Sequence, residues 1–223
     1  MSFTPTEPVS PSAPAPSPTY PGPPVGPRVG VIAFQGDFER HLSVLKTLGA
    51  EARPVRRPEE LDSLQALIIP GGESTTIGML MERFGLLSPV RERVIAGFPV
   101  MGTCAGAILL AREIEGSDQV RIGTLDITIR RNAYGRQVDS FDAPLTVVSP
   151  SFAQVSPAQD DPPVGVFIRA PRIIDLGSSV ETIALVDDDP VVVRSGGMLA
   201  LTFHPELTGD HRLHRYFLSM IRR

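Results

Sequence analysis

The lone cysteine of the chain lies in a setting that favours nucleophilic chemistry. Cys104 stands in the run Gly102-Thr-Cys-Ala-Gly106, between a short apolar segment and a segment with helical spacing. A nucleophile at a tight strand-to-helix turn projects above the edge of a sheet, and flanking glycines permit that turn. Free N–H groups at a helix start also favour a thiolate over a thiol. A free cysteine can equally be a small buried hydrophobe, but this setting favours a catalytic one.

A catalytic thiol needs a base, and the base needs a group that fixes its tautomer. His204 ends an apolar run and is followed by Pro205 and Glu206. In an extended segment, side chains two residues apart project to the same side, so Glu206 can bind one imidazole nitrogen while the other faces Cys104. The sequence therefore predicts a triad of Cys104, His204 and Glu206.

The other three histidines are predicted to be structural or exposed. His41 falls in a helical segment near the start, and His211 and His214 fall beside two arginines near the end, a pattern that indicates a solvated face. A metal site made by Glu206, His211 and His214 is conceivable, but two histidines three residues apart on a polar helix are weak evidence for one. The sequence therefore predicts neither a metal nor a cofactor.

Acyl transfer also needs N–H donors aimed at the oxygen of a tetrahedral intermediate. Ala105, directly after the cysteine, supplies one candidate. The turn Pro70-Gly-Gly-Glu-Ser-Thr-Thr76 supplies the other through Gly72, because a glycine pair lets the backbone approach a small substrate. An ordinary strand-end turn is the alternative. A phosphate cradle is disfavoured because no lysine follows the glycines.

The elements that must position these residues alternate between apolar runs and helical segments, as in a parallel sheet covered by helices. We expect strands at 28–34, 66–69 and 98–101 and helices at 37–48, 88–97 and 107–114. After Gly123 we expect strands at 125–130, 145–148, 164–168, 182–186, 191–194 and 198–203, an irregular loop over Ser149–Pro163, and a last helix at 209–221. The predicted fold is a three-layer α/β domain, flavodoxin-like, with a mostly parallel sheet and helices on both faces. Parallel strands bring their carboxyl ends to one edge, where Cys104 and His204 can meet.

Composition sets the limits of this domain. The chain has 223 residues, and ten of its 23 prolines lie in the first 27. Residues 1–27 also hold no lysine or arginine and few large apolar side chains, so we predict a disordered tail there and one folded domain over residues 28–223. A net charge of -4 without a basic run argues against nucleic-acid binding. One cysteine excludes an intramolecular disulfide, and no apolar run approaches the ~20 residues of a membrane helix, so we expect a soluble, cytoplasmic protein.

Taken together, these motifs resemble the class I, triad-type glutamine amidotransferases. More narrowly, the chain is similar to the family of glutaminase subunits of pyridoxal 5′-phosphate synthase. The segments that carry the resemblance are Pro70–Thr76, Gly102–Gly106, Arg131–Phe141, Gly165–Pro171 and His204–Thr208. The cysteine and His-Pro-Glu runs occur throughout the superfamily, whereas Arg131–Phe141 and Gly165–Pro171 are the discriminating ones. The resemblance covers residues 28–223.

The resemblance implies hydrolysis of L-glutamine to L-glutamate and ammonia through a thioester on Cys104. His204 would be the base that later protonates the leaving ammonia, and Glu206 would orient it. The implied glutamine-binding positions are Gly72, Glu73, Ser74, Arg131, Ile168 and Arg169. From the residues alone, the two arginines could equally be structural ion-pair partners. The implied partner is a synthase subunit that activates the glutaminase and uses its ammonia to build pyridoxal 5′-phosphate.

The chain departs from the family pattern at the proline-rich tail, at the long Ser149–Pro163 loop and at Tyr134, where phenylalanine is expected. None of these departures touches the triad. Three alternatives stay open at this point. The chain could be a glutaminase subunit serving another amidotransferase, a cysteine peptidase or deglycase-like stress protein, or a regulatory domain that retains the motifs as structure.

Overall fold

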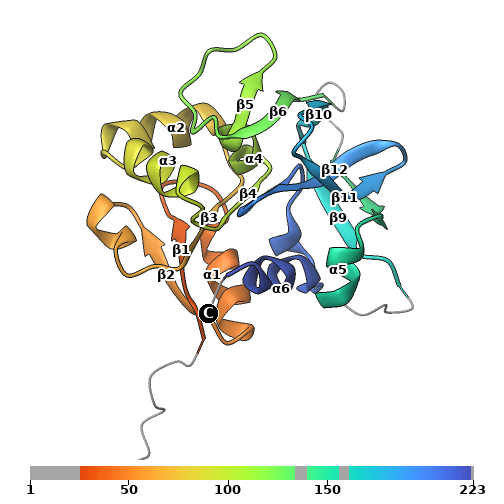
Figure 1. Ribbon diagram of the computed structural model, residues 1–223, viewed down its shortest axis with the longest axis horizontal. Helices are drawn as coiled ribbons and strands as arrows, with labels where there is room; N and C mark the ends of the chain where they lie inside the picture. The colour runs from red at the N-terminus through yellow and green to blue at the C-terminus, as the bar shows by residue number, and fades with distance from the viewer. Residues whose placement is uncertain (1–25, 134–139, 156–160, 222–223) are drawn as a thin grey trace, which may run out of the picture.

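A twisted central sheet runs through the molecule (Figure 1). The structure is a computed structural model that describes residues 26–133, 140–155 and 161–221. Among these residues, the strand order of the central sheet is β2-β1-β3-β4-β13-β12-β11-β8. The strands are β1 (Arg28–Ile32), β2 (Glu51–Val55), β3 (Ala66–Ile69), β4 (Val100–Thr103), β8 (Thr146–Val147), β11 (Glu181–Val186), β12 (Asp189–Ser195) and β13 (Met198–Leu201). The sheet is parallel from β2 to β13 and antiparallel beyond it.

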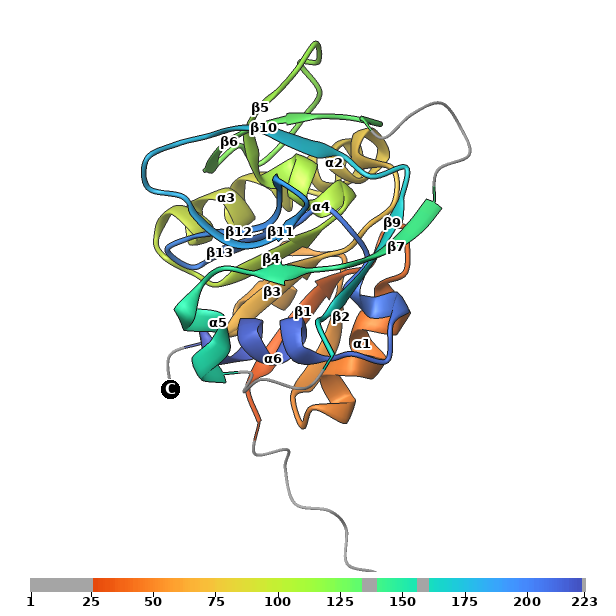
Figure 2. The same ribbon diagram turned by 90° about the vertical axis from the view of Figure 1, so that its right-hand side faces the viewer.

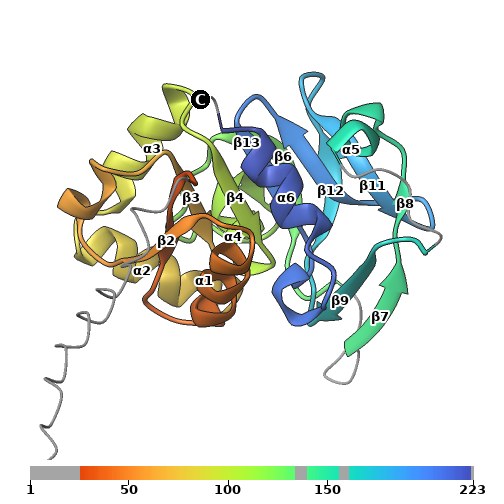
Figure 3. The ribbon, with the colours of Figure 1, turned by 90° about the horizontal axis from the view of Figure 1, so that it is seen from below.

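Helices cover both faces of this sheet (Figures 2 and 3). One face carries α1 (Phe38–Thr47) and α6 (Arg212–Ser219), with α5 (Pro150–Val155) against α6. The other carries α2 (Ser74–Arg83), α3 (Leu87–Ile95) and α4 (Ala105–Leu110). Two apolar clusters correspond to the two faces, and each joins strand residues to the helices of its own side. The prediction of a three-layer α/β fold is confirmed.

Two small sheets flank the central one. The first is made of β5 (Ala111–Ile114), β6 (Leu125–Arg130) and β10 (Arg172–Leu176), and the second of β7 (Ser140–Pro144) and β9 (Val164–Ile168). Short 3₁₀ turns, η1 (Pro58–Leu61) and η2 (Pro205–Leu207), complete the described elements. The position of β9 matters most for function, because the backbone N–H of His204 donates to the carbonyl of Val166 at 2.9 Å.

Several predicted elements are wrong, for identifiable reasons. The helix expected over 107–114 ends at Leu110, and Ala111–Ile114 is a strand that pairs with β6. The apolar run there fits either structure, and periodicity cannot separate them. The loop expected over Ser149–Pro163 contains helix α5, with Pro150 at its first position and Phe152 buried beneath it.

The structure describes only part of the predicted tail and domain. Strand β1 begins at Arg28, and the carbonyl of Pro27 accepts from Glu51 N at 3.0 Å. Residues 1–25 of the predicted tail, residues 134–139 of the discriminating motif and residues 156–160 of the long loop lie outside the described residues. In the part of the chain that the structure describes, no helix is long and apolar enough to cross a bilayer.

Candidate active site

The predicted catalytic residues meet at one edge of the central sheet. Strands β3, β4 and β13 are parallel neighbours, and Ile69 is in register with Gly102 while Leu201 is in register with Thr103. The segments that leave these strand ends carry Gly71 and Gly72, then Cys104, then His204. Three segments far apart in the sequence therefore converge on one point, as expected for the carboxyl edge of an α/β sheet.

Cys104 occupies a strained turn between β4 and α4. Its backbone angles are φ 47° and ψ −102°, and its N–H donates to the carbonyl of Leu201 at 2.8 Å. Positive φ is unfavourable for a residue with a side chain, so the surrounding structure must hold the turn in place. Both flanking glycines are needed for that. A Cβ on Gly102 would lie 2.5 Å from the backbone of Gly106, and a Cβ on Gly106 would lie 2.0 Å from the carbonyl oxygen of Ile69.

The ring of His204 lies between the thiol and a buried carboxylate. Its Nδ1 is 2.8 Å from Oε1 of Glu206, and the side chain also hydrogen-bonds Cys104. Burial alone would lower the pKa of His204, but the hydrogen bonds and charges of Cys104 and Glu206 outweigh it and raise that pKa to about 10. The ring is therefore an imidazolium at neutral pH.

Gly71 sets the position of that ring from the opposite side. A Cβ on Gly71 would lie 2.3 Å from Cε1 of His204, so the backbone of the glycine turn packs directly on the imidazole. The sequence predicts that the glycine pair lets the backbone approach a substrate. Contact with His204, the predicted catalytic base, is a second reason for a glycine at position 71.

A cavity of about 250 Å³ opens beside the thiol. Cys104 and His204 form part of its wall. The rest of the wall includes the glutamine-binding positions that the sequence predicts: Gly72, Glu73, Ser74, Arg131, Ile168 and Arg169. Glu206 lies behind His204, buried and outside this wall. The cavity is of a size for a small metabolite, with acidic and basic groups together on its wall.

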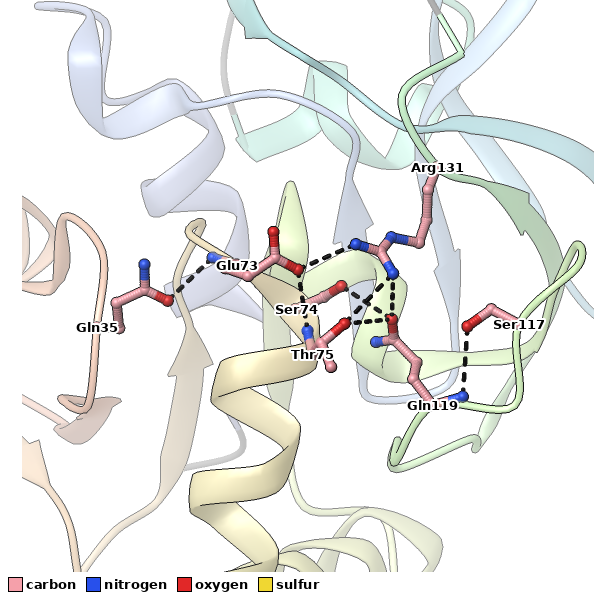
Figure 4. Close-up of polar contacts among 7 residues, drawn as sticks. All are labelled: Gln35, Glu73, Ser74, Thr75, Ser117, Gln119 and Arg131. Carbon is pink, nitrogen blue, oxygen red and sulfur yellow. Dashed lines mark hydrogen bonds and ion pairs between the residues drawn. The ribbon is translucent and has the colours of Figure 1, made fainter.

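Arg131 is held by a polar network at the start of α2 (Figure 4). Its guanidinium forms an ion pair with Oε1 of Glu73 at 3.0 Å and donates to Oε1 of Gln119 at 2.8 Å. The same Gln119 oxygen accepts from the hydroxyls of Ser74 and Thr75, so one amide joins the arginine to the helix start. Arg131 is therefore an ion-pair partner, which the sequence left as one of two possibilities. Both Arg131 and Glu73 also line the cavity.

Arg169 differs from Arg131. It follows β9 with φ 44°, is exposed, and lines the cavity close to Ile168. Among the described residues, no ion pair is formed by its guanidinium. The backbone candidates for the oxyanion hole also lie at this edge. Gly72 has φ 141°, a value that favours glycine, and Ala105 is the first residue of α4.

Sequence reasoning missed the polar residues behind this wall. Gln119 and Gln35, whose amide oxygen accepts from Glu73 N at 3.0 Å, belong to no motif and reach the site only through the fold. The prediction of a solvated face for the last helix is also wrong. His41 and His214 are fully buried and face each other at 3.0 Å beneath the site. Among the described residues, the group whose ligand atoms lie close enough to hold a metal ion is Asp37, His204 and Glu206, not the set of Glu206, His211 and His214 considered above.

Comparison with known proteins identifies the scaffold that carries this site. Residues 31–223 match the model of the SNO glutamine amidotransferase family. The chain belongs to that family. Within the SNO family, it is 52% identical over 194 residues to the pyridoxal 5′-phosphate synthase subunit PdxT of Carboxydothermus hydrogenoformans, covering 87% of this chain and 97% of that protein. It is 47% identical over 195 residues to PdxT of Thermotoga maritima, covering 87% of this chain and all of that protein. The resemblance derived from the motifs is confirmed.

Solved structures agree with the family assignment. A crystal structure titled glutamine amidotransferase matches with a TM-score of 0.79 and 51% identity, covering 86% of this chain and 98% of that one. The structure of PurLQS from Thermotoga maritima matches with a TM-score of 0.65 at 17% identity, covering 89% of this chain and all of the matched one. The second likeness shows the fold alone.

Proposed function

We propose that Cys104, His204 and Glu206 hydrolyse the side-chain amide of L-glutamine in the cavity described above. The observation that carries this proposal is the meeting of Cys104 and His204 with the predicted glutamine-binding residues in one small cavity. Six separate segments of the chain supply that wall. Such an arrangement is what an enzyme needs to hold a substrate against a nucleophile.

The chain is a glutaminase subunit of pyridoxal 5′-phosphate synthase. Family membership and about 50% identity to PdxT proteins over most of the chain support this function. Its partner is the synthase subunit, which uses the ammonia released from glutamine. In our proposal this partner also activates the glutaminase, and the complex works in the cytoplasm.

The reaction begins with attack of the Cys104 sulfur on the Cδ carbonyl of glutamine. A C–S bond forms, and the carbonyl electron pair moves to the oxygen. The N–H groups of Gly72 and Ala105 donate hydrogen bonds to the resulting oxyanion. The His204 imidazolium then gives its proton to the amide nitrogen as the C–N bond breaks, which releases ammonia and leaves a γ-glutamyl thioester. His204, now neutral, takes a proton from water, which attacks the thioester and frees glutamate and the thiolate.

Charged groups on the wall match the amino-acid end of glutamine. Free glutamine presents an ammonium and a carboxylate, so we assign Glu73 to the ammonium and Arg169 to the carboxylate, with Arg131 holding Glu73 in place. Ser74 and Ile168 shape the space between that end and the thiol. Removing a charged contact of this kind raises KM more than it lowers kcat, because the contact exists before the transition state.

Labelling with an electrophilic glutamine analogue tests the nucleophile and the substrate class together. We expect mass spectrometry to find a γ-glutamyl adduct on Cys104, and excess L-glutamine to protect against it. Cys104→Ala should lose both labelling and ammonia release while its thermal unfolding stays near that of the wild type. Continued turnover of glutamine by this variant in the synthase complex would reject the proposed nucleophile.

A further inference from the structure

The second oxygen of the Glu206 carboxylate faces a histidine that no motif predicts. Glu206 is buried, and its Oε1 is committed to His204. Its Oε2 lies 3.3 Å from Nε2 of His41, which comes from α1, more than one hundred residues away in the sequence. Among the described residues, this buried oxygen accepts no hydrogen bond, and its contact with His41 is at ion-pair distance only. The same His41 nitrogen forms a hydrogen bond with the hydroxyl of Thr103 at 3.3 Å.

A third histidine decides which nitrogen of His41 carries the proton. Nδ1 of His41 is 3.0 Å from Nε2 of His214 in α6, and Nδ1 of His214 is buried with no partner among the described residues. A buried N–H without an acceptor costs more than a bare lone pair, so His214 holds its proton on Nε2 and donates it to His41. His41 must then hold its own proton on Nε2, pointing toward Glu206.

Burial keeps both of these histidines neutral. It lowers the pKa of His41, against the opposing charge of Glu206, and it lowers the pKa of His214 further. The other titratable groups around the pair are His204, Asp37 at the start of α1, and His211 on α6. A neutral His41 with its proton on Nε2 presents that N–H to Thr103 and to the carboxylate oxygen that lacks a hydrogen bond, without adding a positive charge to the buried cluster.

We propose that His41 is a positioning residue of the glutaminase, which holds the second oxygen of Glu206 while His214 fixes the tautomer of His41. The triad thereby extends inward as a chain from Cys104 through His204, Glu206 and His41 to His214. A carboxylate held at both oxygens cannot rotate away from the imidazolium, and it stays ionised in a buried site. No proton leaves His41 during the reaction. This inference rests on the proposed roles of the triad.

Two substitutions at His41 separate this role from simple packing. His41→Leu removes the Nε2–H donor and introduces an apolar side chain of similar size. His41→Gln instead keeps an N–H near the position of Nε2. In the full complex with the synthase subunit, we expect the leucine variant to lose about 10- to 100-fold in kcat, the range for one hydrogen bond to a charged group. KM for glutamine should hardly change, since His41 does not line the cavity. The glutamine variant should recover most of the lost rate.

The pH profile gives a readout that packing alone does not move. When the Nε2–H of His41 is removed, the pKa of Glu206 rises and the pKa of His204 falls. The range of pH over which His41→Leu is active should therefore narrow at both its acid and its alkaline end. His211→Leu is the matched control, because His211 packs on His214 and makes no contact with His41 among the described interactions. It should leave the kcat profile unchanged.

An unchanged profile in His41→Leu, or equal losses in the leucine and glutamine variants, would overturn the positioning role. If the leucine variant does not fold, His41→Asn takes its place. The asparagine amide reaches only the position of Nδ1, so this variant should not recover the lost kcat. These outcomes are distinct from failure of the proposed function. That failure would appear as glutamine turnover by Cys104→Ala, whatever the state of His41.

Discussion

Two neighbours control the charge on His204, and in the proposed mechanism that charge decides when ammonia can be released. Burial lowers the pKa of His204, but the hydrogen bonds and negative charges of the Cys104 sulfur and the Glu206 carboxylate raise it by more. Glu206 can play this part because it is itself ionised. Burial would raise its pKa, but the nearby His41 and His204 hold that pKa below its ordinary value.

The pKa of His204 predicts the alkaline limit of activity. Because this pKa is raised from 6.5 to about 10, the imidazolium persists below that pH and is lost as pH rises through it. We therefore expect kcat/KM for glutamine to fall above pH of about 10, as the proton for the leaving ammonia disappears. Steady-state ammonia release from the synthase complex, measured from neutral to strongly alkaline pH, checks this.

Glu206→Gln is the variant that tests the cause of this limit. It removes the charge that favours the imidazolium, so the alkaline limb should move toward lower pH and kcat should fall roughly 10²- to 10⁴-fold, as when a base loses its orienting carboxylate. An alkaline limb at the same pH in this variant would show that Glu206 does not set the charge of His204.

At the scale of elements, the site depends on how closely the turn after β3 packs against the turn after β13. Gly71→Ala introduces a Cβ that would meet the His204 ring at 2.3 Å, while its backbone has no positive φ that would strain alanine. The ring must therefore shift, and a misplacement of about 1 Å can cost on the order of 10²-fold in rate. We expect a loss of kcat of that order with little change in melting temperature.

Gly209→Ala is the matched control for this substitution. A Cβ on Gly209 meets nothing within 4 Å, so the same change of residue type should leave both activity and melting temperature as in the wild type. If Gly71→Ala retains full activity, the contact between the turn and the ring is not what positions His204.

The sequence predicted elements well where a pattern had one interpretation. Strands β6 and β9 have the predicted bounds, because β6 alternates apolar and polar residues and β9 is a short apolar run. Helix α2 was missed, since its start overlaps the glycine-rich turn and Gly78 lies in its middle. Strand β2 was missed because it is an edge strand with Pro54 and little apolar alternation.

The site residues also fall into two groups, those that a local pattern predicts and those that it does not. Cys104, His204 and Glu206 stand in short motifs, so their types and spacing predict their roles. His41 and Gln119 act through contacts with segments that are distant in the sequence, such as His214, 173 residues from His41. Long-range contacts of this kind leave no local pattern, and only the fold brings them into view.

For the whole molecule, the open question is how the glutaminase is controlled by its partner. One proposed oxyanion donor, the N–H of Gly72, belongs to a glycine turn whose second residue has φ 141°. Glycine crosses between backbone regions easily, so this peptide can rest with its N–H turned away from the substrate. Such a resting state would prevent the free chain from consuming glutamine without use of the ammonia.

We therefore expect the isolated chain to be a poor glutaminase and the synthase subunit to complete the oxyanion hole. A single oxyanion donor is worth about 10²- to 10³-fold in kcat, so adding the synthase subunit should raise ammonia release by roughly that factor. Alkylation of Cys104 by iodoacetamide provides the internal control, because displacement at a saturated carbon builds no oxyanion. Its rate should change little on complex formation if the partner acts on Gly72, and should rise in parallel with turnover if the partner instead acts on the triad. Equal rates of ammonia release with and without the synthase subunit would reject activation by the partner altogether.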